Sequence, residues 1–250
     1  MPSKHPIEIA NLAKVEEAIS FCVMQGRSLR LSLIQGLHKT LMQGVPEEPG
    51  HPLKPGELRN ATDQLKVYEV RHRTDYVSPA WRVRQDLITL LEDTENGRLP
   101  GDNSTELAAR FHYRFVRIHP FCDGNGRMAR ALSMFLLARE DPDVLLFEKP
   151  INAILLEHRE DYVGTLEYCD SLYIGFAEED MSEEDKLKAC EKPFLFFYLK
   201  AVSIAMYEQA IRLKKQLVDD DVLSVESIGP LPSSLDLSLA TIKSELRKVG

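Results

Sequence analysis

The sequence is short of the features that mark an exported, membrane-spanning or nucleic-acid-binding protein. Its 250 residues carry a formal net charge of -8, so no basic surface for nucleic acid is indicated. No apolar run approaches the length of a membrane span. We expect no signal peptide either, because residues 1–5 lead straight into polar helical sequence. We therefore expect a cytoplasmic protein with no nucleic-acid or membrane partner, while export by a signal-independent route stays open.

Cysteine is also scarce. The four cysteines, at positions 22, 122, 169 and 190, are scattered and lack metal-ligand spacing, which is typical of reduced thiols. Hydrophobic residues make up 44% of the chain, which is enough for a sizeable core and too much for a disordered chain. The length suits one large domain, or one domain with extensions.

Apolar residues recur at helical spacing along most of the chain. One such stripe is formed by Leu107, Phe111, Phe115 and Ile118, at spacings of four, four and three. This pattern predicts an all-α fold. The expected helices lie at residues 8–24, 28–43, 80–94, 104–118, 125–139, 152–170, 184–216 and 238–248.

Three segments depart from the helical pattern. Four prolines make residues 45–56 a loop, because proline lacks the amide donor that a helix needs. β-Favouring residues on both sides of a polar turn predict one small exposed β-hairpin within 61–77. An acidic run followed by Ser, Pro and Gly predicts a solvated linker and a short C-terminal helix over 218–250, so that 1–217 would form the main domain.

Residues 119–130 read His-Pro-Phe-Cys-Asp-Gly-Asn-Gly-Arg-Met-Ala-Arg and hold the densest set of chemical groups. Pro120 disfavours helical geometry at His119, which places this imidazole at the end of a helix, where it can accept a proton. Phe121 is expected to anchor the loop in the core. Asp123 suits Mg²⁺, which takes one or two protein carboxylates, and it equally suits the N-cap of the next helix.

A glycine-rich turn, Gly124, Asn125 and Gly126, comes directly before the next expected helix. Glycine frees the backbone to turn its N–H groups towards one point, and a helix start favours anions. Arg127 and Arg130 are three residues apart, so both can face that point. Cations are unfavourable near a helix start, and a bound polyphosphate would offset this cost; a pair of solvated arginines is the alternative.

Two neighbouring side chains have simpler interpretations. His112 lies two turns before His119 and is expected to pack as a structural histidine. Cys122 is interpreted as a spacer rather than a reactive thiol. A metallohydrolase using His112, His119 and Asp123 would bind a transition metal, but the set lacks a tight ligand pair such as HExxH.

The segment 119–130 matches the signature of the Fic family, HPFxDGNGRxxR, at every specified position, and the chain resembles the AMP-transferring class of that family. Weaker similarities are the LHxxL pattern at 37–41, the PGxxR pattern at 55–59 and the segment 76–79. In all, about 8–210 resembles the family. The resemblance implies a Fic-type helical bundle in which the hairpin at 61–77 is a flap that holds a target protein.

The resemblance also implies a protein adenylyltransferase. His119 would be the general base that removes the proton of a Ser, Thr or Tyr hydroxyl on the target. Asp123 would hold Mg²⁺ against the α- and β-phosphates of ATP. The residues implied in nucleotide binding are Phe121, Gly124, Asn125, Gly126, Arg127 at the β-phosphate and Arg130 at the γ-phosphate.

Regulation is where the sequence departs from the family. The inhibitory motif [S/T]xxxE[G/N] has no full copy: residues 241–246 read TxxxEL, and Ile7-Glu8 lacks both the hydroxyl and the glycine. Glu245 reaches Arg130 only if the tail folds back; otherwise inhibition comes from a partner chain or is absent. Tyr162 resembles a tyrosine near the nucleotide, but Val163 follows it where a second tyrosine is common, so core packing is preferred.

Two alternatives to AMP transfer stay open. One is a Fic enzyme that transfers another phosphate-containing group, such as UMP or phosphocholine. The other is a non-catalytic module that binds a nucleotide or a partner. The sequence does not decide whether the chain forms a homo-oligomer.

Overall fold

The computed structural model describes residues 6–47, 53–61, 63, 77–101, 103–147, 149–176, 179–219 and 242–244. These residues form helices and contain no strand, which confirms the all-α class. The helices are α1 (Pro6–Met24), α2 (Leu31–Leu41), α3 (Val83–Glu95), α4 (Ser104–Ile118), α5 (Asn125–Glu140), the 3₁₀ helix η2 (Pro142–Leu146), α6 (Ile151–Glu157), α7 (Arg159–Gly175), α8 (Glu183–Cys190) and α9 (Lys192–Asp219).

Parts of the predicted hairpin and tail lie outside the described residues. Of the flap, 61, 63 and 77 are described, so the hairpin stays a prediction. The proposed linker begins inside α9, which runs to Asp219, and 220–241 lie outside the described residues. Of the expected C-terminal helix, 242–244 are described and are helical.

Two helices predicted as continuous are each interrupted once. The expected helix 152–170 is divided into α6 and α7 at His158, whose backbone leaves helical geometry at φ -98° and ψ 37°. The expected helix 184–216 is divided into α8 and α9 at Glu191. Pro193 lies in the first turn of α9, where it lacks the amide donor that would continue a helix from α8.

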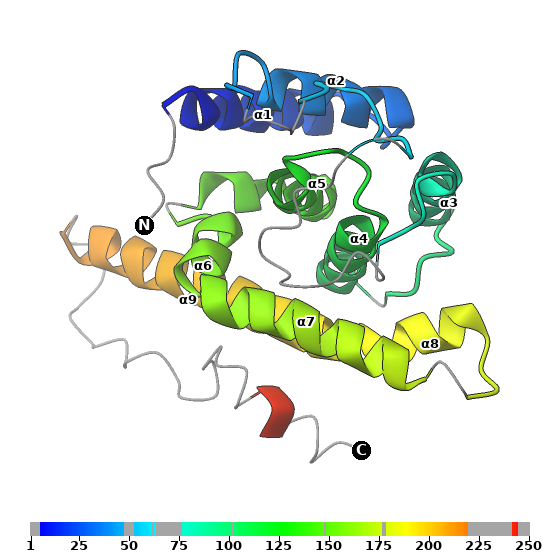
Figure 1. Cartoon of the computed structure of the whole chain (residues 1–250). Helices are drawn as coiled ribbons and strands as arrows, with labels where there is room; N and C mark the ends of the chain where they lie inside the picture. The colour runs from blue at the N-terminus through cyan, green and yellow to red at the C-terminus, as the bar shows by residue number, and fades with distance from the viewer. Residues whose placement is uncertain are drawn as a thin grey trace. The chain divides into compact units, whose positions relative to one another are not determined.

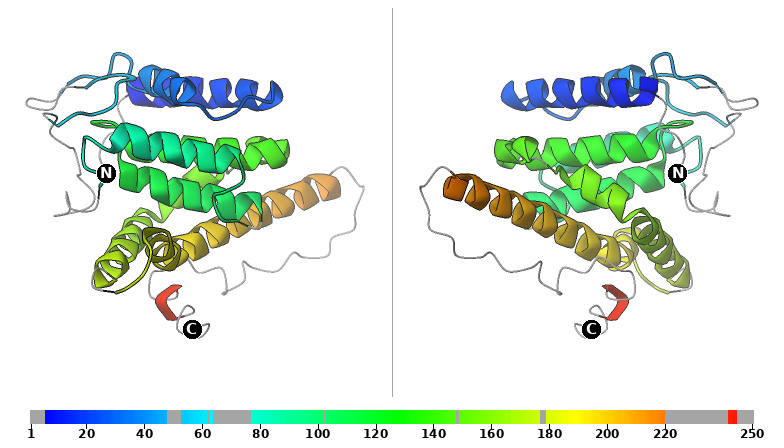
Figure 2. Two further views of the ribbon diagram at one scale, coloured as in Figure 1. Left: turned by 90° about the vertical axis from the view of Figure 1, so that its right-hand side faces the viewer. Right: turned by 90° about the vertical axis from the view of Figure 1, so that its left-hand side faces the viewer.

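The chain divides into two compact units, Met1–Pro142 and Asp143–Gly250. In the first unit α5 packs against both α4 and α1, α2 lies beside α1, and α3 packs against α4 (Figures 1 and 2). Helix α5 is therefore central, and its residues from Met128 to Ala138 are almost all buried. Its sequence neighbour α4 buries Phe111 and Phe115, as the apolar stripe predicted, although Leu107 is only partly buried.

In the second unit α9 packs against α6 and α7. The aromatic residues Phe194, Phe197 and Tyr198 of α9 are fully buried. The ring of Tyr162, on α7, meets Phe194 edge-on with centroids 6.0 Å apart. Tyr162 is thus a core residue, as the sequence indicated.

In the described part of the chain, α9 is long and apolar enough to cross a membrane by length and composition alone. The segment Lys192–Leu213 reaches a mean hydropathy of 1.2. The expectation that no apolar segment approaches the length of a membrane span was therefore wrong by length and composition. Of that segment's apolar window, 44% is buried inside the structure. A core helix passes the same test, and the packed aromatic face of α9 is typical of one.

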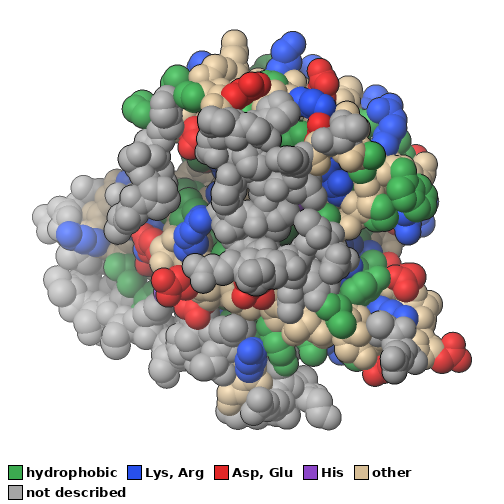
Figure 3. Space-filling model, viewed as in Figure 1, with side chains coloured by type: hydrophobic (Ala, Val, Ile, Leu, Met, Phe, Trp, Pro, Cys, Tyr) green, Lys and Arg blue, Asp and Glu red, His purple; other side chains and the backbone are tan. Residues whose placement is uncertain are grey.

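Charged side chains of both signs are interspersed over α1 and α2 on the face shown in Figure 3. The net charge of -8 is therefore not gathered into a single acidic patch over these two helices.

Candidate active site

His119 terminates α4, as the proline after it predicted. It is the C-cap of this helix, with φ 49° and ψ 60°, and among the described residues no other non-glycine residue has a positive φ. Its Nδ1 lies 3.3 Å from the carbonyl oxygen of Val116. A carbonyl can only accept, so Nδ1–H donates and Nε2 is left as the proton-accepting nitrogen. The helix end therefore fixes the tautomer that a general base needs.

A buried arginine holds the end of α4 in place. The Nε of Arg59 donates to the carbonyl of His119 at 2.6 Å, and its Nη2 donates to the carbonyls of Ile118, at 3.2 Å, and Ser78. The backbone N–H of Arg59 donates to the carbonyl of Pro120 at 2.9 Å. The bonds to Ile118 and His119 satisfy carbonyls that the end of a helix leaves without partners. Sequence reasoning noted Arg59 as part of a motif but missed this role.

The same arginine affects the charge state of His119. Burial, with a smaller contribution from the nearby Arg59 guanidinium, lowers the pKa of His119 to about 4, although the Val116 carbonyl and Asp123 act in the opposite direction. The imidazole is therefore neutral at pH 7 and can take a proton.

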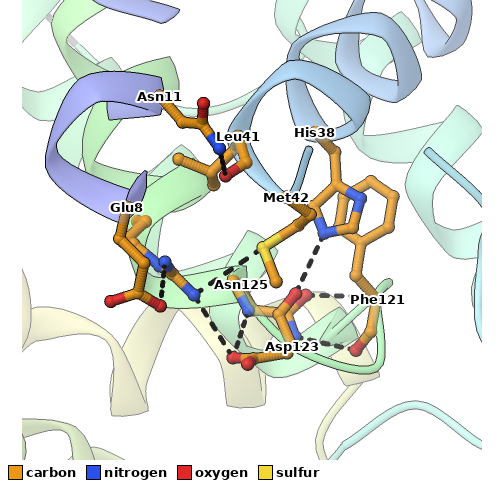
Figure 4. Close-up of polar contacts among 10 residues, drawn as sticks. Glu8, Asn11, His38, Leu41, Met42, Phe121, Asp123 and Asn125 are labelled. Atoms are coloured by element: carbon orange, nitrogen blue, oxygen red, sulfur yellow. Dashed lines mark hydrogen bonds and ion pairs between the residues drawn. The ribbon is translucent and has the colours of Figure 1, made fainter. Parts of the chain in front are cut away.

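The loop after His119 is closed by the side chain of Asn125. Its Nδ2 donates to the Phe121 carbonyl at 2.8 Å, and its Oδ1 accepts the Phe121 N–H at 2.9 Å (Figure 4). Asn125 is buried, so its amide shapes the loop from inside. Phe121 is fully buried, which confirms its predicted role as an anchor.

A second histidine, which sequence reasoning did not single out, joins this loop to two distant segments. Nε2–H of His38 donates to the Asp123 carbonyl at 3.0 Å, while Nδ1 accepts the Gly56 N–H at 2.9 Å. Its ring also stacks on Phe121 with centroids 3.6 Å apart. Burial lowers the pKa of His38 to about 4, so this neutral bridge persists at neutral pH. The LHxxL and PGxxR patterns were the available signal.

Gly124 begins α5 in a left-handed conformation, with φ 78°. The backbone angle at Gly124 requires glycine, and a Cβ there would lie 3.0 Å from the Sδ of Met42, so this side chain would have to shift. Gly124, the N-cap of α5, has no side chain to cap the first-turn amides, and the start of a helix favours anions. A Cβ at Gly126 would lie 3.5 Å from the Nη1 of Arg130, which places this guanidinium beside the first turn.

Arg127 is held by carboxylates. Its Nη1 donates to the Oε1 of Glu8 at 2.7 Å, and its Nη2 lies 3.6 Å from the Oδ1 of Asp123 and 3.7 Å from the Sδ of Met42. Figure 4 shows Glu8, Met42 and Asp123 around this position. The Ile7-Glu8 segment, which lacked the inhibitory motif, thus contacts the first motif arginine. Glu245 lies outside the described residues.

His112 has the structural role that was expected. It is fully buried, and its Nδ1 lies 3.2 Å from the Oγ of Ser133. Burial, with a contribution from Arg130, lowers the pKa of His112 to about 3. Within the described ranges no group of three His, Cys, Asp or Glu side chains is arranged to hold a metal ion, so the metallohydrolase interpretation has no ligand set there.

Parts of the chain are similar to known proteins. Residues 28–137 match the model of the Fic/DOC family. The chain is 29% identical over 147 residues to "Protein adenylyltransferase Fic" of Nematostella vectensis, covering 56% of this chain and 31% of that protein. It is 35% identical over 118 residues to "Protein adenylyltransferase fic-1" of Caenorhabditis elegans, covering 46% and 20%. The chain thus spans a third or less of the length of these relatives.

Two solved structures share the fold. A Fic family protein from Desulfovibrio desulfuricans G20 superposes with a TM-score of 0.60 at 23% identity, covering 96% of this chain and 64% of that one. A Fic domain containing signalling protein from Bacteroides thetaiotaomicron VPI-5482 gives 0.58 at 24% identity, covering 89% and 75%. The helical fold is the one that these two Fic structures share, and residues 28–137 match the model of the Fic/DOC family.

Proposed function

We propose that this protein is an adenylyltransferase that transfers AMP from ATP to a Ser, Thr or Tyr hydroxyl of a target protein. The observation that carries the proposal is that one short loop joins a neutral His119, with Nε2 as its accepting nitrogen, to the start of α5 at Gly124. The names of the curated relatives support the same activity at the level of the family.

The residues present fit a magnesium–triphosphate ligand. Asp123 is partly exposed on the loop, and Mg²⁺ needs few protein carboxylates because phosphate oxygens and water complete its shell. Asp123 would hold Mg²⁺, which when bound neutralises phosphate charge. The backbone of 124–126 and the guanidinium groups of Arg127 and Arg130 would bind the phosphates.

In this proposal the protein forms no covalent intermediate, because transfer at phosphorus depends mainly on positioning and charge stabilisation. The acceptor hydroxyl loses its proton to the Nε2 of His119, while Nδ1–H stays bonded to the Val116 carbonyl. A bond forms between the hydroxyl oxygen and the α-phosphorus. The bond from the α-phosphorus to the bridging oxygen breaks, and pyrophosphate leaves. In this proposal the target segment binds at residues 61–77.

Label transfer tests the proposal. The protein is incubated with lysate, Mg²⁺ and ATP labelled at the α-phosphate, beside His119→Ala and the control His158→Ala. Wild type and the control should transfer label, and His119→Ala should be slower by about 10²–10⁴-fold, as is typical when a general base is removed. Binding of ATP without any transfer by wild type would instead support a non-catalytic module.

The transferred group is identified by mass spectrometry of the modified proteins. An added AMP on Ser, Thr or Tyr supports the proposal. An added UMP or phosphocholine, in reactions supplied with UTP or CDP-choline, would support another transferase of the same family.

A further inference from the structure

His38 holds one peptide unit at the point where the motif loop passes into α5. Its Nε2–H donates to the carbonyl of Asp123 at 3.0 Å, and Figure 4 shows the ring reaching from α2 towards this carbonyl. The N–H of the same peptide unit, that of Gly124, donates to the Oδ1 of Asp123 at 2.6 Å. Both polar groups of the peptide unit are therefore bonded, which fixes its plane together with the carboxylate of Asp123.

The ring of His38 is itself held from its other side. Its Nδ1 accepts the N–H of Gly56 at 2.9 Å, and Gln35, one turn earlier on α2, donates its Nε2 to the carbonyl of the same glycine at 2.9 Å. Gly56 has φ 81°, and a Cβ there would lie 2.8 Å from the carbonyl oxygen of Gln35, so this position requires glycine. His38 is only 2% exposed, and its two ring nitrogens have different roles, so the imidazole has one orientation.

The segment that follows Gly56 holds the opposite end of the loop. The N–H of Arg59 donates to the Pro120 carbonyl at 2.9 Å, and its Nε donates to the His119 carbonyl at 2.6 Å. The loop 119–123 is thus held at its first residues by Arg59 and at its last residue by His38. The two supports serve different ends of the site, because Arg59 holds the proposed base and His38 holds the proposed metal ligand.

We propose that His38 is a positioning residue for the magnesium–triphosphate ligand: its Nε2–H fixes the 123–124 peptide unit and so holds the carboxylate of Asp123 beside the start of α5. This inference rests on the proposed function, in which Asp123 and the backbone of 124–126 bind Mg·ATP. The bond to Gly56 orients the imidazole. The bond to Asp123 is therefore the one on which the affinity for Mg·ATP depends.

Two amide substitutions separate the two bonds of the ring. The amide of glutamine reaches about as far from the backbone as the Nε2 of histidine, so His38→Gln can still donate to the Asp123 carbonyl. The amide of asparagine ends near the position of Nδ1, so His38→Asn can accept from Gly56 but does not reach Asp123. Both substitutions remove the ring that stacks on Phe121, so a role in packing alone would make the two variants alike.

Isothermal titration calorimetry with Mg·ATP measures the difference between them. The Kd of His38→Asn should rise about 5- to 10-fold, as for the loss of one hydrogen bond. The Kd of His38→Gln should stay within about twofold of wild type, because the donor to Asp123 is kept. Gln35→Ala is the matched control, since it removes the other bond from α2 to Gly56 and leaves the bond to Asp123 in place. Its Kd should equal that of wild type.

Amide hydrogen exchange without nucleotide gives a second readout. Peptides that cover residues 119–126 should exchange about 3- to 10-fold faster in His38→Asn than in His38→Gln or Gln35→Ala, because only the first loses the bond to the loop. If His38→Asn does not fold, NMR correlation of the imidazole nitrogens in wild type decides instead. The proton must be on Nε2 and not on Nδ1, because the opposite tautomer has no donor for Asp123 and would overturn the proposal.

The outcomes distinguish this inference from the proposed function. Equal Kd values for His38→Asn and His38→Gln overturn the inference and leave the proposed function standing. If wild type binds Mg·ATP but transfers no label, the proposed transfer is wrong, and the two variants still decide the role of His38. If wild type does not bind Mg·ATP, both are wrong.

Discussion

The guanidinium of Arg127 is paired with the carboxylate of Glu8, with Nη1 and Oε1 2.7 Å apart although 119 residues separate them in the chain. The pair is partly buried, with 18% of the Arg127 side chain and 32% of the Glu8 side chain exposed. Arg127 is one of the two cations assigned to the triphosphate. The carboxylate of Glu8 therefore neutralises a guanidinium that an incoming phosphate would need as its partner.

Replacing Glu8 with Gln should strengthen nucleotide binding, because a competing anion is removed from Arg127. We expect the Kd for Mg·ATP to fall about 3- to 10-fold, as for loss of an ion pair worth about 1 kcal/mol. Isothermal titration calorimetry measures the change. Glu17→Gln, at an exposed position of the same helix, is the matched control. Equal or weaker binding by Glu8→Gln would show that the carboxylate orients Arg127 rather than competing for it.

Removing the charge of Arg59 should raise the pKa of His119 from about 4 towards its ordinary value of 6.5, because Arg59 disfavours the imidazolium. NMR titration of the imidazole protons in Arg59→Gln measures this shift, and the acid limb of the transfer rate should move with it. Arg59→Lys keeps the charge and should keep the pKa low. The pKa of His112, which is lowered by burial and Arg130, should not respond. A His119 pKa unchanged in Arg59→Gln would contradict the electrostatic argument.

Acid should weaken the fold through its buried histidines. The pKa values of His38 and His112, at about 4 and about 3 in the folded protein, lie below the ordinary 6.5. The unfolded chain therefore binds more protons below pH 6.5, and stability that is complete above this pH is lost as the pH falls towards 4. The free energy of unfolding, measured with urea, should be lower at pH 5 than at pH 7.5 by roughly 1–2 kcal/mol for each histidine.

His38→Gln should flatten that dependence, because an amide can donate and accept but does not titrate in this range. His158→Gln, at a partly exposed position between α6 and α7, is the control. If the free energy of unfolding of His38→Gln falls with pH as steeply as that of wild type, His38 is not a source of the acid sensitivity.

The two motif glycines should respond differently to alanine. Gly124→Ala forces a side chain into φ 78° and against Met42, so the free energy of unfolding should fall by about 1–3 kcal/mol. Gly126 is helical and has room for a Cβ, so Gly126→Ala should keep or raise stability. It should still weaken Mg·ATP binding, since the methyl group would lie beside Arg130 at the anion site. Gly36→Ala, with nothing near its Cβ position, controls for helix propensity. Equal loss of stability at both motif positions would refute this distinction.

Local signals in the sequence predicted the outline of the site. Pro120 located the end of α4, and the glycine-rich turn located the start of α5 within one or two residues. Both features depend on the backbone preferences of a few adjacent residues, which a sequence displays directly.

The connections of the site were not predictable in the same way. The contacts of His38 with Asp123, Arg59 with His119 and Glu8 with Arg127 join residues that are 85, 60 and 119 positions apart. No periodicity encodes which distant polar groups will meet, because only the tertiary packing of the chain brings them together. The breaks at His158 and Glu191 were missed for a related reason: an interruption at a single residue barely disturbs an apolar pattern that continues on both sides.

The ring of two hydrogen bonds between Asn125 and Phe121 has a thermodynamic consequence for the whole motif. The loop loses its conformational freedom when the chain folds, long before any nucleotide arrives. A ligand then meets a rigid receptor and spends little of its interaction energy on ordering the backbone. Selectivity among nucleotides must therefore come from the groups around the loop, because the loop itself has the same shape for all of them.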